Sequence, residues 1–458
     1  MNVRLPWGVI IAATLWPVTS WGVGFSALGR LPDTNQSRAT DVSQTGSVAG
    51  TSDNTAFRWT LAGGLQSLGV QTQTPPVISG NGAVVAGGRA TVVGSGRALW
   101  RWTAGGGAVD ISPASALCSH ASSMSYDGSL LTSFADQTID SGAFQCKWTS
   151  SGGLVGLSGL PDHIQFYSRA MIDLGGDDVI GESGVNHLPH GFLWHAGTPV
   201  ANTWLCNTPA DPFEVGVGCS PAQMTQDGAF VAGATFIGNI DQVDPGHAFR
   251  WTPGAGLEDL GELAGGADAS AATSLDGMGR RVVGWGTTVA GQEAMLWDAA
   301  HGMRRVVDVL ASYGVAVPIG WTLRGASRIS TNGRFLVGYG DHIGHTEAWR
   351  VELADLPTVL LRARWFVGQL PPSAVTKAMR TSLLARLNLA YQAAVKLPSL
   401  PFLVQSWTQL SVAALLKQMD AKTQSCGSPG SSFLSCPAAD TLDDYLQDAL
   451  LWLPGSGF

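Results

Sequence analysis

Charged side chains are scarce in this chain. Asp, Glu, Lys and Arg make up 13% of its 458 residues, and the formal net charge is −8. An average soluble domain contains about 25% charged residues. Nucleic-acid binding requires a basic face or stripe. The sequence has no such stripe, so we expect no nucleic-acid partner.

Long apolar runs and catalytic motifs are also lacking. After the N-terminal segment, no run reaches the roughly 20 apolar residues that a membrane-spanning helix needs. Neither a Gly-x-Ser-x-Gly nucleophile elbow nor a phosphate-binding glycine loop followed by Lys occurs. The sequence therefore predicts no transmembrane segment after the N-terminal one, no catalytic residues and no cofactor.

Residues 1–22 have the pattern of a signal peptide. Arg4 supplies a positive start, Trp7 to Trp16 forms an apolar core, and Pro17 ends it. Small residues then suit cleavage after Ser20, or after Gly22. An uncleaved anchor is the alternative interpretation. We predict an exported protein, either secreted or periplasmic.

Seven tryptophans mark an internal repeat. An Ala-Phe-Arg-Trp-like element recurs at intervals of 43 to 57 residues, with its Trp at Trp59, Trp102, Trp148, Trp194, Trp251, Trp297 and Trp349. Repeats of this length built from short strands are typical of propeller blades. Glycine, at 59 residues, is close to twice its usual share of about 7%. This abundance fits many tight turns between strands.

A turn of the form Ser-x-Asp-Gly, or a relaxed version of it, also occurs seven times. Asn or Asp followed by Gly suits the positive φ angles of a tight hairpin. The predicted turn glycines are Gly46, Gly82, Gly128, Gly176, Gly228, Gly277 and Gly333. Four residues earlier lies a column that is apolar with one exception: Val42, Ile78, Met124, Ile172, Met224, Thr273 and Ile329. We expect this column and the tryptophans to pack neighbouring sheets together.

The two ends of the repeat array complement each other. The first unit contains four predicted strands, near 38–43, 47–51, 55–60 and 65–70. The last unit has only three, near 327–331, 335–339 and 347–353. Residues 25–31 (FSALGRL) resemble the fourth strand of another unit, 257–263 (LEDLGEL). We therefore predict a mainly β fold, a seven-bladed β-propeller over residues 24–354 that is closed by the N-terminal strand.

Six cysteines, an even number, fit an exported and oxidised protein. Fifteen pairings are possible. Closeness in sequence favours Cys118–Cys146, Cys206–Cys219 and Cys426–Cys436.

The repeated elements resemble a known family. AFRWT at 56–60, HAFRWT at 247–252 and SRISTNGRFLVGYG at 327–340 look like the extracellular HAF-repeat family. The resemblance covers about residues 24–354 and implies an exported bacterial β-propeller. The family's biochemical activity is largely undefined, so the resemblance transfers no catalytic residues to this chain.

Residues 355–458 carry a helical pattern. Ser373 is a predicted N-cap, followed by an i, i+4 apolar stripe from Val375 to Val395; further helices are predicted over 404–419 and from about Thr441. TSLLARLNLAYQAAVK and PAADTLDDYLQDALLWL resemble small helical modules of the FIMAH type, which implies a C-terminal three-helix domain.

This segment is more basic than the remainder of the chain. It has eight Lys and Arg against six Asp, whereas the remainder has 18 basic against 28 acidic residues. Electrostatic attraction could therefore hold this segment against the more acidic propeller. An independent bundle on a Pro-containing linker is the alternative.

Few charged residues fall on the predicted inner strands. They are Asp41, Arg169, Asp173 and Arg328. Asp41 and Arg328 occupy the same place in the first and last units, so ring closure predicts an ion pair between them. We expect a ligand at the channel mouth formed by these residues, or at the loop clamped by Cys206 and Cys219.

Histidines and acidic residues offer weaker patterns. The pairs His187–His190 and His342–His345 could share a metal ion if a third ligand approached. His190 and His247 also lie at predicted strand starts. A polar side chain is common at such a position, so these histidines need no metal to explain them. The acidic stretch 239–244 lacks a full calcium-loop pattern. The sequence thus predicts no metal site.

Three classes of function remain. We predict a non-catalytic binding module, expected to be a monomer, whose partner is a glycan or an envelope or extracellular protein. The alternative is a carbohydrate-active hydrolase or lyase, which would need paired carboxylates, or a base beside a basic partner, at the channel. A purely structural role in the envelope is the third.

Overall fold

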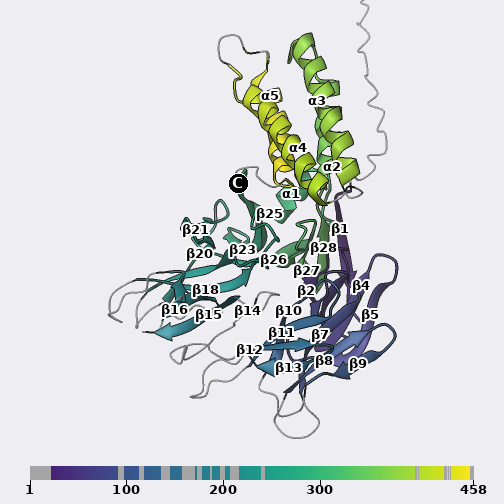
Figure 1. Ribbon diagram of the computed structural model, residues 1–458, viewed down its shortest axis with the longest axis vertical. Helices are drawn as coiled ribbons and strands as arrows, with labels where there is room; N and C mark the ends of the chain where they lie inside the picture. The colour runs from purple at the N-terminus through teal and green to yellow at the C-terminus, as the bar shows by residue number, and fades with distance from the viewer. Residues whose placement is uncertain are drawn as a thin grey trace, which may run out of the picture.

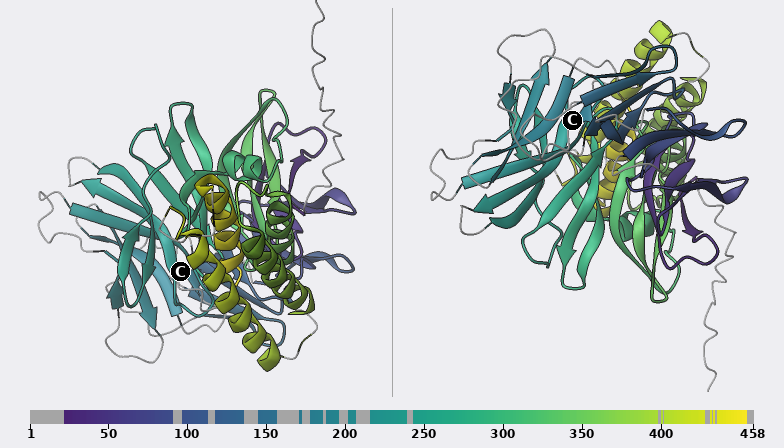
Figure 2. Two further views of the ribbon diagram at one scale, coloured as in Figure 1. Left: turned by 90° about the horizontal axis from the view of Figure 1, so that it is seen from above. Right: turned by 90° about the horizontal axis from the view of Figure 1, so that it is seen from below.

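The predicted strands form separate small sheets rather than one continuous sheet. The computed structural model describes residues 22–90, 97–112, 118–135, 145–156, 171–172, 178–185, 188–195, 202–206, 216–238, 243–397, 400, 402–427, 431, 433 and 435–453. Within these ranges the chain is mainly β, with seven four-stranded antiparallel sheets and five helices (Figure 1). Seen along a perpendicular direction, the sheets fan around a common centre (Figure 2).

Each of the first three sheets uses four consecutive strands. Sheet 1 contains β2 (Ser37–Val42), β3 (Val48–Ser52), β4 (Thr55–Thr60) and β5 (Gly64–Gln71). Sheet 2 contains β6 (Val77–Ile78), β7 (Val84–Ala90), β8 (Arg97–Thr103) and β9 (Gly107–Asp110). Sheet 3 contains β10 (Cys118–Met124), β11 (Leu130–Ala135), β12 (Gln145–Thr149) and β13 (Gly153–Gly156). The strands predicted for the first unit are confirmed to within one or two residues at each end.

The next three sheets repeat this order. Sheet 4 contains β14 (Met171–Ile172), β15 (Asp178–Val185), β16 (Leu188–His195) and β17 (Asn202–Trp204). Sheet 5 contains β18 (Gly216–Met224), β19 (Val231–Gly238), β20 (Val243–Thr252) and β21 (Gly256–Asp259). Sheet 6 contains β22 (Ser270–Leu275), β23 (Arg281–Thr288), β24 (Gly291–Asp298) and β25 (Gly302–Arg305).

Sheet 7 takes its fourth strand from the other end of the β region. It contains β26 (Trp321–Ile329), β27 (Phe335–His342), β28 (His345–Glu352) and β1 (Gly24–Gly29). β1 runs antiparallel to β28, with Phe25 opposite Val351 and Ala27 opposite Trp349. The predicted pairing of the N-terminal strand with the last unit is confirmed.

Sheets 1 and 7 are in direct contact. Leu28, Val42, Trp59, Phe335 and Val337 are buried in one apolar cluster. The Ala348 amide donates to Ser37 Oγ at 2.9 Å, and Asn332 Nδ2 donates to the Gln44 carbonyl at 2.9 Å. The first and last repeats are therefore neighbours in space.

In sheets 1, 2, 5 and 7 the arginine of the Ala-Phe-Arg-Trp element contacts the next sheet. Arg58 Nε donates to the carbonyl of Gly82 in the following turn at 2.8 Å, and its guanidinium lies 5.9 Å from the Trp102 ring centre. The same two contacts recur from Arg101 to Gly128 and Trp148, from Arg250 to Gly279 and Trp297, and from Arg350 to Gly46 and Trp59. Sheet 7 thus contacts sheet 1 through the same arginine contact that joins sheets 1 and 2, 2 and 3, and 5 and 6.

One predicted turn was placed two residues too early. Gly46, Gly82, Gly128, Gly228 and Gly333 have positive φ as expected, but in sheet 6 this conformation belongs to Gly279 (φ 63°) and not to Gly277. The apolar position of sheet 6 is consequently Leu275, which is 2% exposed, and not Thr273. Asp276 takes the place of the turn serine, so the Ser-x-Asp-Gly pattern of this unit is shifted by two residues. Gly176 lies outside the described residues.

The helical segment contains four helices instead of the predicted three. They are α2 (Leu356–Gln369), α3 (Lys377–Lys396), α4 (Phe402–Thr423) and α5 (Cys436–Leu450), while α1 (Val306–Ser312) follows sheet 6. The first predicted helix begins near Ser373, beyond the end of α2, so α2 was not expected as a separate helix. Proline is well tolerated in the first helical turn, and Asp355 caps this helix by accepting from the Thr358 amide at 3.0 Å.

Two predicted helix starts need correction. Thr376, not Ser373, caps α3 by accepting a hydrogen bond from the Met379 amide. α5 begins at Cys436, five residues before Thr441, and has proline in its first turn. The predicted helix start at Thr441 therefore lies inside α5.

The helices pack on sheets 6 and 7 and cover one face of the array (Figures 1 and 2). One apolar core combines Leu296 and Trp349 of the sheets with Leu360, Leu387 and Leu446 of the helices. Arg280 Nη1 donates to the carbonyls of Leu450 and Leu451 at 3.4 and 3.3 Å. The segment is joined to the sheets by an apolar interface, unlike a bundle on a free linker. Among the described residues, no helix is both long and apolar enough to cross a membrane.

The three predicted disulfides are confirmed. Cys118 bonds Cys146 across sheet 3, Cys206 bonds Cys219, and Cys426 bonds Cys436 between α4 and α5. Residues 1–21, which carry the predicted signal peptide up to its last position, lie outside the described residues.

Candidate functional site: a polar pocket between the sheets

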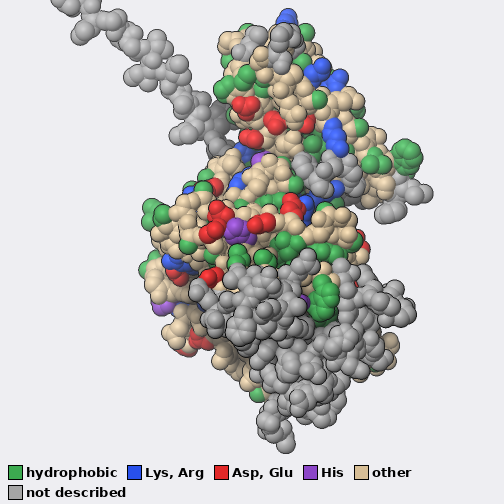
Figure 3. All heavy atoms as spheres, turned by 90° about the vertical axis from the view of Figure 1, so that its left-hand side faces the viewer, with side chains coloured by type: hydrophobic (Ala, Val, Ile, Leu, Met, Phe, Trp, Pro, Cys, Tyr) green, Lys and Arg blue, Asp and Glu red, His purple; other side chains and the backbone are tan. Residues whose placement is uncertain are grey.

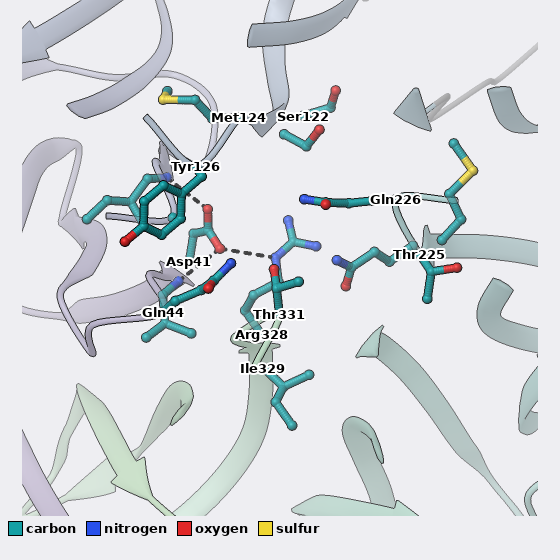
Figure 4. Close-up of a pocket in the computed structure, with 16 residues that line it drawn as sticks. Asp41, Gln44, Ser122, Met124, Tyr126, Thr225, Gln226, Arg328, Ile329 and Thr331 are labelled. Atoms are coloured by element: carbon teal, nitrogen blue, oxygen red, sulfur yellow. Dashed lines mark hydrogen bonds and ion pairs between the residues drawn. The ribbon is translucent and has the colours of Figure 1, made fainter. Parts of the chain in front are cut away.

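A pocket lies where the first strands and first turns of several sheets converge (Figure 4). It encloses about 770 Å³ of space not filled by atoms, part of it open to solvent. Its lining comes from sheets 1, 2, 3, 5 and 7 and consists of Asp41, Val42, Gln44, Ile78, Gly80, Ser122, Ser123, Met124, Tyr126, Gln223, Met224, Thr225, Gln226, Arg328, Ile329 and Thr331.

The predicted ion pair lies in this pocket. Arg328 Nε is 3.5 Å from Asp41 Oδ1. Asp41 also accepts from the amides of Val42 and Ile78 at 2.9 and 2.8 Å. Burial raises the pKa of Asp41, and the Arg328 charge and these two amides oppose that rise. Asp41 therefore connects three sheets, because Ile78 belongs to sheet 2 and Arg328 to sheet 7.

The other predicted ligand residues cannot be placed. Arg169 and Asp173 lie outside the described residues, as does the stretch 207–215 of the clamped loop. Their predicted contribution to ligand binding stays a prediction.

Most of the lining consists of neutral groups that can donate or accept hydrogen bonds. Amides come from Gln44, Gln223 and Gln226, and hydroxyls come from Ser122, Ser123, Tyr126, Thr225 and Thr331. The Gln223 amide oxygen already accepts from the Leu275 amide at 3.1 Å. Gln44 and Gln226 lie on opposite sides of the Arg328 guanidinium in Figure 4.

Tyr126 supplies an aromatic surface to the same pocket. Its side chain is 57% exposed. A Cβ on Gly80 would lie 2.7 Å from Tyr126 Cδ2, so the glycine gives the ring room to lie against the backbone of sheet 2. Replacing Gly80 would displace the ring.

These neutral residues were not among the predicted ligand residues, which were all charged. Gln44, Gly80, Tyr126, Gln226 and Thr331 all occupy the same place, the second position of the repeated turn. The first position, a serine or threonine in these turns, closes the turn; Ser125 Oγ, for example, donates to Asp127 at 2.8 Å. The variable second position was therefore the signal that could have identified the pocket.

His342 and His345, the described histidine pair, each contact a different partner. His342 Nδ1 lies 2.9 Å from Glu347 Oε2, and its ring stacks on Trp321. His345 Nδ1 lies 3.2 Å from the Asn35 carbonyl. His187 and residues 239–242 lie outside the described residues.

Comparisons with known proteins give similarity to solved structures alone. No family model matches the chain, and no curated protein matches it. The β-propeller domain of the Trilobed protease from Pyrococcus furiosus shares 10% identity, with 73% of this chain and 96% of that chain covered at a TM-score of 0.43. TolB from Acinetobacter baumannii shares 12% identity, with 58% and 61% covered at a TM-score of 0.37. With both TM-scores below 0.5, we transfer no functional residue from these proteins.

Proposed function

We propose that this chain is an exported, closed seven-bladed β-propeller of the HAF-repeat type that binds a glycan in its central pocket. The contacts of β1 with β28, and of sheet 1 with sheet 7, support a ring. Three disulfides support an oxidising compartment outside the cytoplasm. We further propose that α3 to α5 form the FIMAH-type module predicted from sequence.

The lining of the pocket carries the proposal of a glycan. A sugar presents many hydroxyl groups and one weakly polar ring face. The pocket offers amides and hydroxyls for the former and the exposed Tyr126 ring for the latter. A protein partner is the second candidate that sequence analysis raised, but nothing in this lining favours it.

Binding is favoured over hydrolysis by the charges of the pocket. Glycoside hydrolysis uses two carboxyl groups, either about 5–5.5 Å or about 6.5–9.5 Å apart. Among the described lining residues, Asp41 is the sole carboxylate, and Arg328 and two amides already engage it. We therefore assign to the Asp41–Arg328 pair the role of joining sheets 1 and 7. The same ion pair orients the Arg328 guanidinium toward the proposed ligand.

Screening immobilised and soluble glycans for binding tests the proposal. We expect at least one glycan to bind, and Tyr126→Ala and Gln226→Ala to weaken it about tenfold each, since each removes an exposed contact. Trp365→Ala is the matched control, because Trp365 is equally exposed, at 57%, but lies on α2.

Two results would contradict the proposal. One is glycan binding that neither pocket variant affects. The other is release of reducing ends or unsaturated sugars from a polysaccharide panel, which would favour the carbohydrate-active enzyme.

A further inference from the structure

A histidine surrounded by carboxylates lies at the junction of sheets 5 and 6, away from the pocket. His247 is on β20, Asp259 ends β21, and Glu262 and Asp268 lie in the connection to β22. Figure 3 shows the side of the molecule on which β20 and β21 lie in Figure 1, and there acidic side chains gather around a histidine.

The two ring nitrogens of His247 have different surroundings. Nδ1 lies 2.9 Å from both carboxylate oxygens of Asp259. Nε2 lies 2.6 Å from Asp268 Oδ1 and 3.4 Å from Glu262 Oε2. With its Nδ1–H donated to Asp259, a neutral imidazole directs the Nε2 lone pair toward two anionic oxygens. The negative charge around Nε2 is then balanced either by a second proton on the ring or by a metal ion bound to Nε2 and the two carboxylates.

We propose that His247 Nε2, Glu262 and Asp268 bind a divalent transition-metal ion, with Asp259 orienting the imidazole from behind. A carboxylate on the outer nitrogen of a metal-binding histidine is a common arrangement, because it fixes the tautomer and increases the basicity of the ligand. An imidazole together with two carboxylates suits Zn²⁺ and its neighbours better than Ca²⁺, which binds through oxygen ligands.

The spacing of the ligand atoms fits such an ion. The three ligand atoms all lie within 4.8 Å of one another. Bonds of about 2.1 Å in a tetrahedral site place neighbouring ligand atoms about 3.4 Å apart, which equals the separation of Nε2 from Glu262 Oε2. Asp268 needs to retreat by less than about 1 Å on this geometry, and its side chain, 79% exposed, is free to do so.

The backbone around the site is already held in place. The His247 amide donates to Thr235 Oγ1 at 2.8 Å, and the Leu260 amide donates to the Ala248 carbonyl at 2.9 Å. Leu260 and Leu263 are buried on either side of Glu262. The Gly261 amide donates to Asp259 Oδ1 at 2.8 Å. An ion here would therefore tie β20 to the connection between sheets 5 and 6, and would leave a coordination position for water or a ligand.

Calorimetric titration of the tag-free, chelator-treated full chain with Zn²⁺ tests this inference. We expect a site with a one-to-one stoichiometry that raises the melting temperature of the protein. Asp268→Asn removes one exposed metal ligand and should weaken Zn²⁺ binding at this site at least tenfold. Asp259→Asn should weaken it about 10- to 100-fold through the orientation of His247. The control Glu258→Gln, on the same strand but paired with Arg250, should leave the titration unchanged.

Weaker Zn²⁺ binding in both variants, with the control unaffected, supports the inference. Absence of Zn²⁺ binding overturns it in favour of a second proton on His247 as the balancing charge. Zn²⁺ binding that both variants leave intact, or stronger binding of Ca²⁺ than of Zn²⁺, overturns it equally. None of these results bears on the glycan pocket, which uses other residues.

Discussion

Within its four positions, the repeated turn separates residues that hold the hairpin from residues that line the pocket. Its first position closes the turn through a side-chain hydroxyl, and its glycine supplies positive φ, as at Gly128 (φ 74°). The second position makes neither contribution and differs between sheets: glutamine, glycine, tyrosine and threonine all occur there. A change at this position can therefore alter the pocket without disturbing the hairpin.

A pair of carboxyl groups in the helical segment should make stability depend on pH. Burial, and then a hydrogen bond with Asp443, raises the pKa of Asp420 to about 7. Because the folded pKa lies above the unfolded value, the folded protein holds this proton more tightly. The resulting stabilisation is complete below about pH 4 and is lost as the pH rises through 7.

We expect the free energy of unfolding to fall by about 1–2 kcal/mol between pH 5 and pH 8 from this group, after allowance for solvent screening. Asp420→Asn should remove that part of the pH dependence. Thermal melts at both pH values measure it. The exposed Asp440→Asn serves as the control, and a wild-type profile identical to that of Asp420→Asn would contradict the assignment.

At the scale of strands, the repeated arginine strengthens four of the junctions between neighbouring sheets. Its guanidinium bonds a carbonyl of the next sheet and covers a tryptophan there, so it extends each apolar interface with a directed contact. Burial lowers the pKa of Arg58, and the hydrogen bond to Gly82 offsets part of the desolvation that this implies.

Replacing Arg58 should therefore loosen the contact between sheets 1 and 2. Arg58→Met keeps the apolar stem but loses the hydrogen bond, and we expect a cost of about 1–3 kcal/mol in the free energy of unfolding. Arg89→Met, which breaks only an exposed pair with Asp110, should cost less than about 1 kcal/mol. Equal melting temperatures for the two variants would show that the arginine is dispensable.

Elements whose sequence signal lies within one short segment were predictable from the sequence. Hairpins with Gly turns and strict repeats were predictable because strand, turn and Trp lie within one short segment; β1 was predictable because its sequence resembles that of a fourth strand. α2 was not predicted as a separate helix, because the first N-cap was assigned to Ser373, beyond its end. The pocket was only partly predictable: Asp41 and Arg328 follow from the register, whereas the role of Tyr126 depends on five sheets meeting.

At the scale of the whole molecule, sheets and helices share one core. The cluster that contains Trp349 and Val351 also contains residues of α2 to α5. Tyr313, just after α1, donates to Asp448 of α5 at 2.5 Å. The helical segment therefore has a fixed place against sheets 6 and 7.

A shared core predicts that sheets and helices unfold together. Helical circular dichroism and tryptophan fluorescence should report coincident thermal transitions. Arg280→Ala removes the donor to the last carbonyls of α5 and should lower both midpoints together. Arg386→Ala, which loses only a contact with Gln418 between α3 and α4, should move them less. Two separated transitions in the wild type would instead indicate an independent bundle.

The pairing of Gly24 with Glu352 has a consequence for the timing of folding. Ribosomes deliver the N-terminus first, so the earliest strand waits for a partner that is made more than 300 residues later. Pairings this distant along the chain form slowly, although the entropic penalty of such a long loop rises only logarithmically with its length. Sheet 7 is therefore the last to be completed, and a nascent chain stays incompletely assembled until almost all of its strands have emerged.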